Sequence, residues 1–364
     1  MELLKVIVFD LLSSAPILVG IIALTGLILQ KESVDKVISG TLKTIVGFLV
    51  FGVGSAAAVV ALNSFQTLFA QGFGLKGVLP LAEAVTALAQ QQFGTTVSLV
   101  MMIGFLANLA VAKFTPLKYI FLTGQHNLYL AALLTIMFKA LGMGNTMTVI
   151  LGGLLLGFCA ALFPAIAQPY MRKVTGDDDI AMGHYVTVGY AISGWIGSKV
   201  GNPEDSTENL KLPKWLTMFK DYVVGVSITM VIFFYIAAIA AGQEATEQLS
   251  NGVNWLVFPL FQGLQFAAAL YVIITGVRLF LGEIVQAFVG ISETFIPKAK
   301  PALDCPVVFT FAPTATVIGF LAAYAGGLVT MVIMGFFSPI VIIPVAVPYF
   351  FIGATAGVFG NATG

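Results

Sequence analysis

The feature that most constrains the fold is the long uncharged stretch at the end of the chain. From Cys305 to Gly364 it contains no Asp, Glu, Lys, Arg or His, and a single carboxylate, Asp304, stands at its head. Pro301 and Pro306 flank this carboxylate and disfavour a continuous helix through it. A carboxylate at the start of such an apolar run predicts irregular backbone that lines a polar cavity inside a membrane protein.

The composition of the whole chain is that of a polytopic membrane protein. Charged residues make up 9% of the sequence and hydrophobic residues 59%, whereas about a quarter of the residues of a soluble domain are charged. The net charge is zero, so no basic field points to nucleic acid. Cys159 and Cys305 both lie in apolar stretches, which predicts packing residues and neither a disulfide nor a metal site.

Charge-free windows of the length needed to cross a bilayer recur along the chain. A hydrocarbon core of about 30 Å requires about 20 apolar residues as helix. The windows are 11–30, 44–62, 95–112, 119–138, 146–171, 222–241, 255–277, 314–336 and 340–359. Together with shorter segments they predict an all-α polytopic membrane protein with about 9–11 transmembrane helices.

Lysine and arginine in the short loops give the orientation. With the N-terminus outside, the inside loops hold most of the basic residues, as the positive-inside rule requires. The inside residues are Lys31, Lys36, Lys43, Lys113, Lys118, Arg172 and Lys173, and the outside ones are Lys5, Lys76 and Lys139.

Three segments, 64–93, 180–200 and 281–297, are too polar or too glycine-rich for simple lipid-facing spans, and we interpret them as re-entrant hairpins or buried helices. The pattern of residues 11–93 recurs over 222–297, with Gly52-Val53 answered by Gly276-Val277. By the charge count the two copies enter from opposite sides, which predicts an inverted repeat with substrate near the midplane. Between the copies, an amphipathic interfacial helix is expected around Leu212, Trp215, Leu216 and Phe219.

Candidate chemistry centres on Asp304 and the two histidines of the chain, His126 and His184. Each lies among apolar residues with polar neighbours, and burying unpaired polar groups costs a few kcal/mol each. The alternatives are helix packing for His126, a core histidine for His184, and a surface ion pair of Asp304 with Lys298 or Lys300. The sequence contains no Gly-Lys-Ser phosphate loop, His-Glu-x-x-His or Gly-x-Ser-x-Gly motif, so we expect neither catalysis by this chain alone nor a cofactor or metal.

Several short motifs follow one another along nearly the whole chain, at residues 40–48, 122–124, 183–184, 210–216, 276–280, 303–305 and 309–313. In this order and spacing they resemble the membrane-embedded IIC component of the ascorbate branch of the bacterial phosphotransferase system (PTS). The resemblance implies a homodimer in the bacterial cytoplasmic membrane that carries L-ascorbate, or a related sugar acid or polyol. Separate soluble IIA and IIB proteins would then phosphorylate the substrate.

The same resemblance implies an organisation of the chain. Inverted repeats would supply a scaffold from residues 1–62 and 222–280, and a substrate-holding core from 63–200 and 281–364 with two re-entrant hairpins. Residues 201–221 would form a cytoplasmic amphipathic linker, and the family pattern continues with a further span beyond Gly364.

The resemblance also implies a ligand pocket. Asp304 and His184 match pocket residues of the family, and Ser55 and Glu83 are similarly placed. Members of the family carry histidine after Leu-Thr-Gly and glutamine four residues later, where this chain has Gln125 and Tyr129, with His126 one position along. They also have glutamine after Gly-His, where this chain has Tyr185.

Two other classes of function remain open from the residues alone. One is a proton-coupled secondary transporter in which Asp304 and His184 titrate. The other is a structural or receptor-like membrane protein that binds a solute without moving it.

Overall fold

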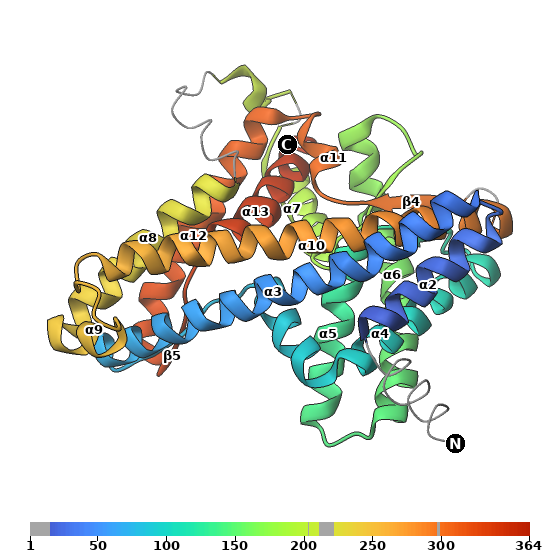
Figure 1. Ribbon diagram of the computed structural model, residues 1–364. Coiled ribbons are helices and arrows are strands. Elements are labelled where there is room, and N and C mark those ends of the chain that lie inside the picture. Colours follow the sequence, from blue (N-terminus) through green and yellow to red (C-terminus); the bar gives the residue numbers. More distant parts are fainter. Residues whose placement is uncertain (1–14, 203, 211–221, 297–298) are drawn as a thin grey trace, which may run out of the picture. The chain divides into compact units, whose positions relative to one another are not determined.

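The computed structural model describes residues 15–202, 204–210, 222–296 and 299–364 and is built mainly of helices (Figure 1). The chain forms two compact units, each assembled from three stretches of sequence. Unit 1 comprises Met1–Gly52, Val85–Ile192 and Ile274–Val307, and unit 2 comprises Val53–Ala84, Ser193–Ile273 and Val308–Gly364.

Unit 1 contains a small sheet surrounded by helices. Its elements are α2 (Ala15–Leu29), the first part of α3 (Val34–Phe73), most of α4 (Ala82–Phe114), β2 (Tyr119–Phe121), α5 (Gly124–Ala140), α6 (Asn145–Thr175), β3 (Ala181–Met182), the start of α7 (Thr187–Val200), the end of α10 (Phe258–Phe295) and β4 (Lys300–Leu303).

Unit 2 is also helical with one strand pair. Its elements are the second part of α3, β1 (Lys76–Val78), the end of α7, the 3-10 turn η2 (Thr207–Asn209), α8 (Tyr222–Ala241), α9 (Gln243–Leu249), the first part of α10, α12 (Pro313–Phe337), β5 (Ile340–Ile342) and α13 (Ala346–Asn361). The short helix α11 (Pro306–Phe309) crosses from unit 1 to unit 2.

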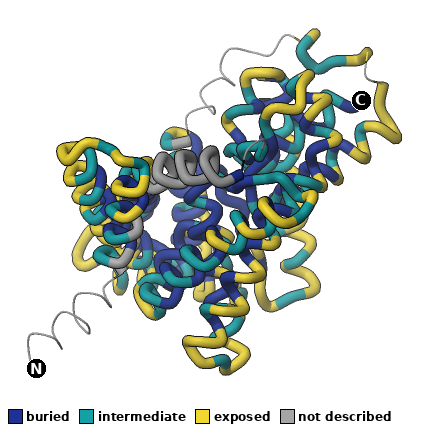
Figure 2. The backbone as a smooth tube through the Cα atoms, turned by 90° about the vertical axis from the view of Figure 1, so that its right-hand side faces the viewer, coloured by how far each residue is buried: buried dark blue, intermediate teal, exposed yellow. Residues whose placement is uncertain are grey.

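Six helices within the described residues are long and apolar enough to cross a membrane. They are Val34–Phe73, Ala82–Phe114, Asn145–Thr175, Val223–Ala241, Phe258–Phe280 and Pro313–Phe337. They confirm the prediction of a largely helical, polytopic membrane protein. Each of these helices carries both buried and exposed residues, as Figure 2 shows for the part of the chain whose burial is described.

Two predicted spans were wrong as continuous helices. Windows 119–138 and 340–359 each begin with a strand, β2 or β5, and their helices start only at Gly124 and Ala346. Pro344 lacks an N–H and so favours a break after β5. The segments predicted at 64–93 and 281–297 do not begin as separate elements. Helix α3 continues through residue 64 to Phe73, and helix α10 continues through residue 281 to Phe295.

The prediction of a purely α-helical chain missed five short strands. They form two parallel sheets, in the orders β1-β5 and β2-β4-β3. Strands of two to four residues leave no alternating pattern in the sequence, so only their pairing reveals them. The first predicted span falls partly outside the described residues, and the predicted interfacial helix around Trp215 lies wholly outside them.

Glycines allow α3 and α10 to pack closely within unit 1. A Cβ built on Gly47 would lie 2.6 Å from the Phe280 backbone nitrogen, and one built on Gly276 would lie 2.3 Å from that of Phe51. The rings of Phe48, Phe51 and Phe280 then fill the space beside this contact. Gly52, in contrast, has no atom within 4 Å of such a Cβ.

Candidate functional site

The sheet β2-β4-β3 in unit 1 brings the candidate residues together. All three strands are parallel, with Phe121 opposite Ala302 and Met182 opposite Leu303. The carboxyl ends of parallel strands meet at one edge, so the segments that follow them converge. His126 follows β2 in the first turn of α5, His184 follows β3, and Asp304 directly follows β4. This confirms the expectation that Asp304 lies on irregular backbone.

Side chains satisfy the outer edges of this sheet, where a membrane offers no water to do so. Asn108 of α4 donates to the Tyr119 carbonyl at 3.1 Å and accepts from the Phe121 N–H at 3.0 Å. Asn127 donates to the Phe121 carbonyl, and Gln168 donates to that of Ile180. The sequence analysis missed the roles of Asn108 and Gln168, although isolated buried amides in predicted spans are a usable signal.

A charge cluster holds the opposite, amino-terminal edge of the sheet. Arg172 of α6 binds Asp178 through Nε and Nη2, at 2.7 and 3.1 Å, and Gln168 donates to the same carboxylate at 2.8 Å. Lys300, the first residue of β4, also pairs with Asp178 and lies over the Tyr119 ring. The Arg172 guanidinium, and then Lys300 and Gln168, hold the pKa of the Asp178 carboxyl well below its usual value. Lys300 therefore pairs with Asp178 and not with Asp304; Lys298 lies outside the described residues.

Asp304 accepts hydrogen bonds from three donors. Oδ1 accepts from His126 Nε2 at 3.1 Å and from the Cys305 backbone N–H at 2.7 Å. Oδ2 accepts from Gln125 Nε2 at 2.5 Å. Among the ion pairs of the described residues, the only one that involves Asp304 is the pair with His126.

Aromatic rings gather beside this carboxylate. The ring centroids of His126 and His184 lie 3.8 Å apart, and Tyr185 stacks on His184 at 4.6 Å. Tyr129 meets His126 edge-on at 5.6 Å. His184 also lies 5.4 Å from Tyr190, whose hydroxyl contacts the sulfur of Cys305. Gln125, His126, Tyr129, His184, Tyr185 and Asp304 thus form one group, which we call the Asp304 cluster.

Two buried polar atoms in and beside this cluster have hydrogen-bonding capacity that the described residues do not use. His126 Nδ1 and Thr123 Oγ1 are buried and have no hydrogen-bond partner among the described residues. A Cβ built on Gly183 would lie 2.4 Å from the Ala302 carbonyl oxygen and 2.8 Å from Thr123 Oγ1, so only glycine fits beside them. Buried polar atoms are almost always paired, so these orphans indicate a ligand or ordered water. Thr123 did not figure among the predicted site residues.

The remaining two predicted site residues belong to unit 2. Glu83 lies in the first turn of α4 and is 8% exposed, and Ser55 lies within α3. The structure therefore does not join them to the Asp304 cluster, and their part in the site stays a prediction.

The cluster has the residue types of a metal site, but the His184 nitrogen that would have to bind the metal carries a hydrogen. Ligand atoms of His126, His184 and Asp304 lie within 4.8 Å of one another. However, His184 Nδ1 accepts the Val186 backbone N–H at 3.0 Å, so the hydrogen of its neutral ring is on Nε2. A nitrogen that carries hydrogen cannot coordinate a metal ion, so we assign no metal here.

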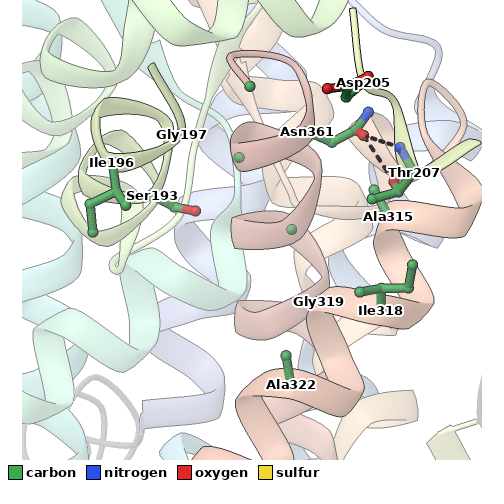
Figure 3. Close-up of a pocket in the computed structure, with 13 residues that line it drawn as sticks. Ser193, Ile196, Gly197, Asp205, Thr207, Ala315, Ile318, Gly319, Ala322 and Asn361 are labelled. Atoms are coloured by element: carbon green, nitrogen blue, oxygen red, sulfur yellow. Dashed lines mark hydrogen bonds between the residues drawn. The ribbon is translucent and has the colours of Figure 1, made fainter. Parts of the chain in front are cut away.

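A cavity of about 340 Å³ lies in unit 2 (Figure 3). Its walls come from α7, the segment around η2, α12 and α13, and many of them are small residues such as Gly197, Ala315, Gly319 and Gly357. Its polar side chains already serve the fold: Asn361 accepts from the N–H and hydroxyl of Thr207, and Ser193 donates to the Ala356 carbonyl. It is less suited to a polar ligand than the Asp304 cluster.

Comparisons with known proteins identify the family to which the chain belongs. Residues 10–364 match the family model EIIC-GAT, described as the PTS system sugar-specific permease component. The chain is also 29% identical, over 416 aligned residues, to a protein of Mycoplasma pneumoniae named "Ascorbate-specific PTS system EIIC component". The alignment covers 99% of this chain and 63% of that relative, so the chain spans less than two thirds of the relative's length.

Proposed function

The chain belongs to the EIIC-GAT family of PTS sugar-specific permease components, and on that premise we propose that it binds a small sugar acid or polyol at the Asp304 cluster and carries it inward. Membership makes it a multi-pass protein of the cytoplasmic membrane and a permease component, not the enzyme that transfers the phosphoryl group. Its partners in this proposal are the soluble IIB and IIA proteins.

The observation that carries the proposal is the composition of the Asp304 cluster. Hydroxylated ligands are held by a few well-placed polar groups beside aromatic faces. The cluster offers Gln125, His126 and His184 around one carboxylate, with the rings of Tyr129 and Tyr185 beside them. The orphaned atoms His126 Nδ1 and Thr123 Oγ1 supply unused hydrogen-bonding capacity at the same place.

L-ascorbate is the first substrate to test. The name of the Mycoplasma pneumoniae relative favours it. Gln125, Tyr129 and Tyr185 are the positions where this chain departs from the expected family pattern, so a related sugar acid or polyol is the alternative. Gln125 stands in place of a histidine, and Tyr129 and Tyr185 stand in place of glutamines. These changes in hydrogen-bonding chemistry would set the specificity.

The order of elements supports an internal repeat. Three pairs of elements begin 224 residues apart in the sequence. Helices α3 and α10 begin at Val34 and Phe258, strands β1 and β4 at Lys76 and Lys300, and helices α4 and α11 at Ala82 and Pro306. Strands β2 and β5 and helices α5 and α13 follow in the same order.

Strand pairing within the two units agrees with this correspondence. β1 pairs with β5, and β2 pairs with β4, both in parallel. In this correspondence β1 is equivalent to β4 and β5 is equivalent to β2. The pair β1-β5 is then equivalent to the pair β4-β2, as expected for repeats related by a two-fold axis. We propose inverted repeats, with re-entrant hairpins built on β1 with the start of α4 and on β4 with α11.

Alternating access follows from such repeats. In this proposal the core parts, 63–200 and 281–364, move against a dimeric scaffold from 1–62 and 222–280, and residues 201–221 link the repeats on the cytoplasmic side. Family membership favours a PTS permease over a proton-coupled carrier or a receptor-like protein.

The experiment that tests the function is binding of radiolabelled L-ascorbate to the purified protein, competed with unlabelled pentitols, hexitols and sugar acids. Displacement by ascorbate alone would identify the substrate. Binding of another sugar in place of ascorbate would keep the permease and reassign its specificity. If none of these compounds binds, the Asp304 cluster is not a sugar site.

A further inference from the structure

We propose that the Asp304 cluster contacts its ligand through His126, with Asp304 as a positioning residue, and that an anionic ligand binds together with one proton on His126. This inference rests on the proposed function, because it concerns how the same cluster receives its ligand. It distinguishes acidic from neutral substrates by their protonation linkage.

The carboxylate of Asp304 is already used by the protein. Both of its oxygens accept hydrogen bonds, from His126 and Cys305 on one side and from Gln125 on the other. These bonds fix the orientation of the His126 ring and of the Gln125 amide, and this positioning is the role that we assign to Asp304.

The hydrogen bonds define which nitrogen of each histidine carries hydrogen. A carboxylate only accepts, so His126 Nε2 donates to Asp304, and Nδ1 of the neutral ring has a lone pair. This Nδ1 is buried without a partner among the described residues. His184 has the same Nε2–H form for a different reason, since its Nδ1 accepts from the Val186 N–H.

Protonation of His126 would therefore change which kind of ligand, neutral or anionic, the cluster prefers. With His126 neutral, the cluster carries the charge of Asp304 and presents an acceptor at His126 Nδ1, which suits a hydroxyl donor of a neutral polyol. With His126 protonated, the His126–Asp304 pair is neutral overall and Nδ1 becomes a donor. At His126 Nδ1, the second form offers a donor to the oxygen of a sugar acid anion, and the first form offers a lone pair that would repel it.

The other groups that face His126 do not provide this positive charge. They are Asp304, His184, Tyr185 and Tyr129. Behind His184 lie Tyr190 and Cys305. Arg172, on the neighbouring helix α6, is bound to Asp178 at the other edge of the sheet. His126 is thus the group able to compensate an incoming anion.

The first test is nitrogen NMR of the full chain labelled with ¹⁵N-histidine. The chain has two histidines, so His126→Gln and His184→Gln assign both rings without ambiguity. Without ligand at alkaline pH, we expect both rings to be neutral with hydrogen on Nε2. Ascorbate should convert the His126 ring, and not that of His184, to imidazolium. A His126 ring with hydrogen on Nδ1 in the unliganded protein would overturn the proposal.

The second test is calorimetry of L-ascorbate binding at pH 8 in phosphate and in Tris, whose heats of ionisation differ. Proton uptake of about one per bound ascorbate is expected, and about zero for a neutral pentitol. His126→Gln should abolish the uptake, whereas the exposed-loop control Asp177→Asn should retain it.

Ascorbate binding without proton uptake, or uptake that persists in His126→Gln, would overturn the inference. Failure of every sugar to bind, with both histidines in the expected form, would instead count against the proposed function. The two failures are therefore distinguishable.

Discussion

At the scale of single residues, the site depends on contacts between side chains far apart in the sequence. Asp304 lies 178 positions from His126 and 179 from Gln125. Its negative charge is costly to bury, and three hydrogen bonds offset that cost. Removing the charge should therefore disorder the donors that it holds.

We predict that Asp304→Asn weakens ligand binding about tenfold or more. The asparagine keeps one acceptor oxygen but turns an amide toward the second donor side chain, and a hydrogen bond to a charged group is worth about 1.5–3 kcal/mol. Equilibrium binding of the ligand identified by the competition assay measures the change. Asp179→Asn, in an exposed loop, is the matched control, and equal affinity of wild type and Asp304→Asn at several pH values would refute the role of Asp304.

At the scale of elements, the two edges of the sheet β2-β4-β3 have separate tasks. The carboxyl edge carries the Asp304 cluster, the proposed ligand site, and the amino edge carries the ion pairs of Asp178 with Arg172 and Lys300. Since β4 connects Lys300 to Asp304 over four residues, the ion pairs position the strand that delivers the carboxylate.

We predict that Asp178→Asn lowers the melting temperature slightly at pH 7. Because the pKa of Asp178 is depressed in the folded protein, its contribution to stability is complete above the ordinary aspartate pKa of 3.8 and is lost as the pH falls through the lower folded value. The difference in melting temperature from wild type should thus be present at pH 7 and shrink at pH 3. Asp177→Asn is the control, and a difference that grows on acidification would contradict the assignment.

The contact between α3 and α10 gives a second prediction at this scale. Gly47→Ala should destabilise the protein by about 1–3 kcal/mol, because the new methyl group meets the backbone of α10 and forces the helices apart. Gly52→Ala, in the same helix, should be neutral or slightly stabilising, because its methyl group meets nothing. Thermal unfolding in detergent compares the two, and equal losses would disprove the tight packing at Gly47.

At the scale of the whole molecule, family membership and six long apolar helices make the protein an integral membrane protein. The lysine and arginine distribution then predicts which loops face the cytoplasm. Helix α6 is a direct test, since it separates an expected outside loop at Gly144 from an expected inside loop at Asp177.

We predict opposite labelling for cysteines placed at the two ends of α6. In a Cys159→Ala background, Gly144→Cys should react with an impermeant maleimide in intact cells, and Asp177→Cys only after the membrane is opened. Neither site is crowded: Gly144 has no atom within 4 Å of an added Cβ, and Asp177 is exposed. The parent without a new cysteine measures background from buried Cys305. Labelling of both from the same side would refute α6 as a span.

The sequence by itself determined the class of the protein and most of its long helices. The reason is that the thickness of the bilayer requires about 20 consecutive apolar residues for each spanning helix, and such a run is visible in the local sequence. It also singled out Asp304, His126 and His184, since isolated ionisable groups in apolar runs are costly and conspicuous.

Only the tertiary structure decided that windows 119–138 and 340–359 begin as strands, because two to four extended residues are stabilised by a partner distant in sequence and not by their own pattern. Only the tertiary structure showed that Lys300 pairs with Asp178 and that His126 pairs with Asp304. It also showed that Thr123 Oγ1 and His126 Nδ1 have no hydrogen-bond partner within the described part of the chain. Such pairings depend on the order and direction of strands in space, and that order is not encoded in the spacing of residues along the chain.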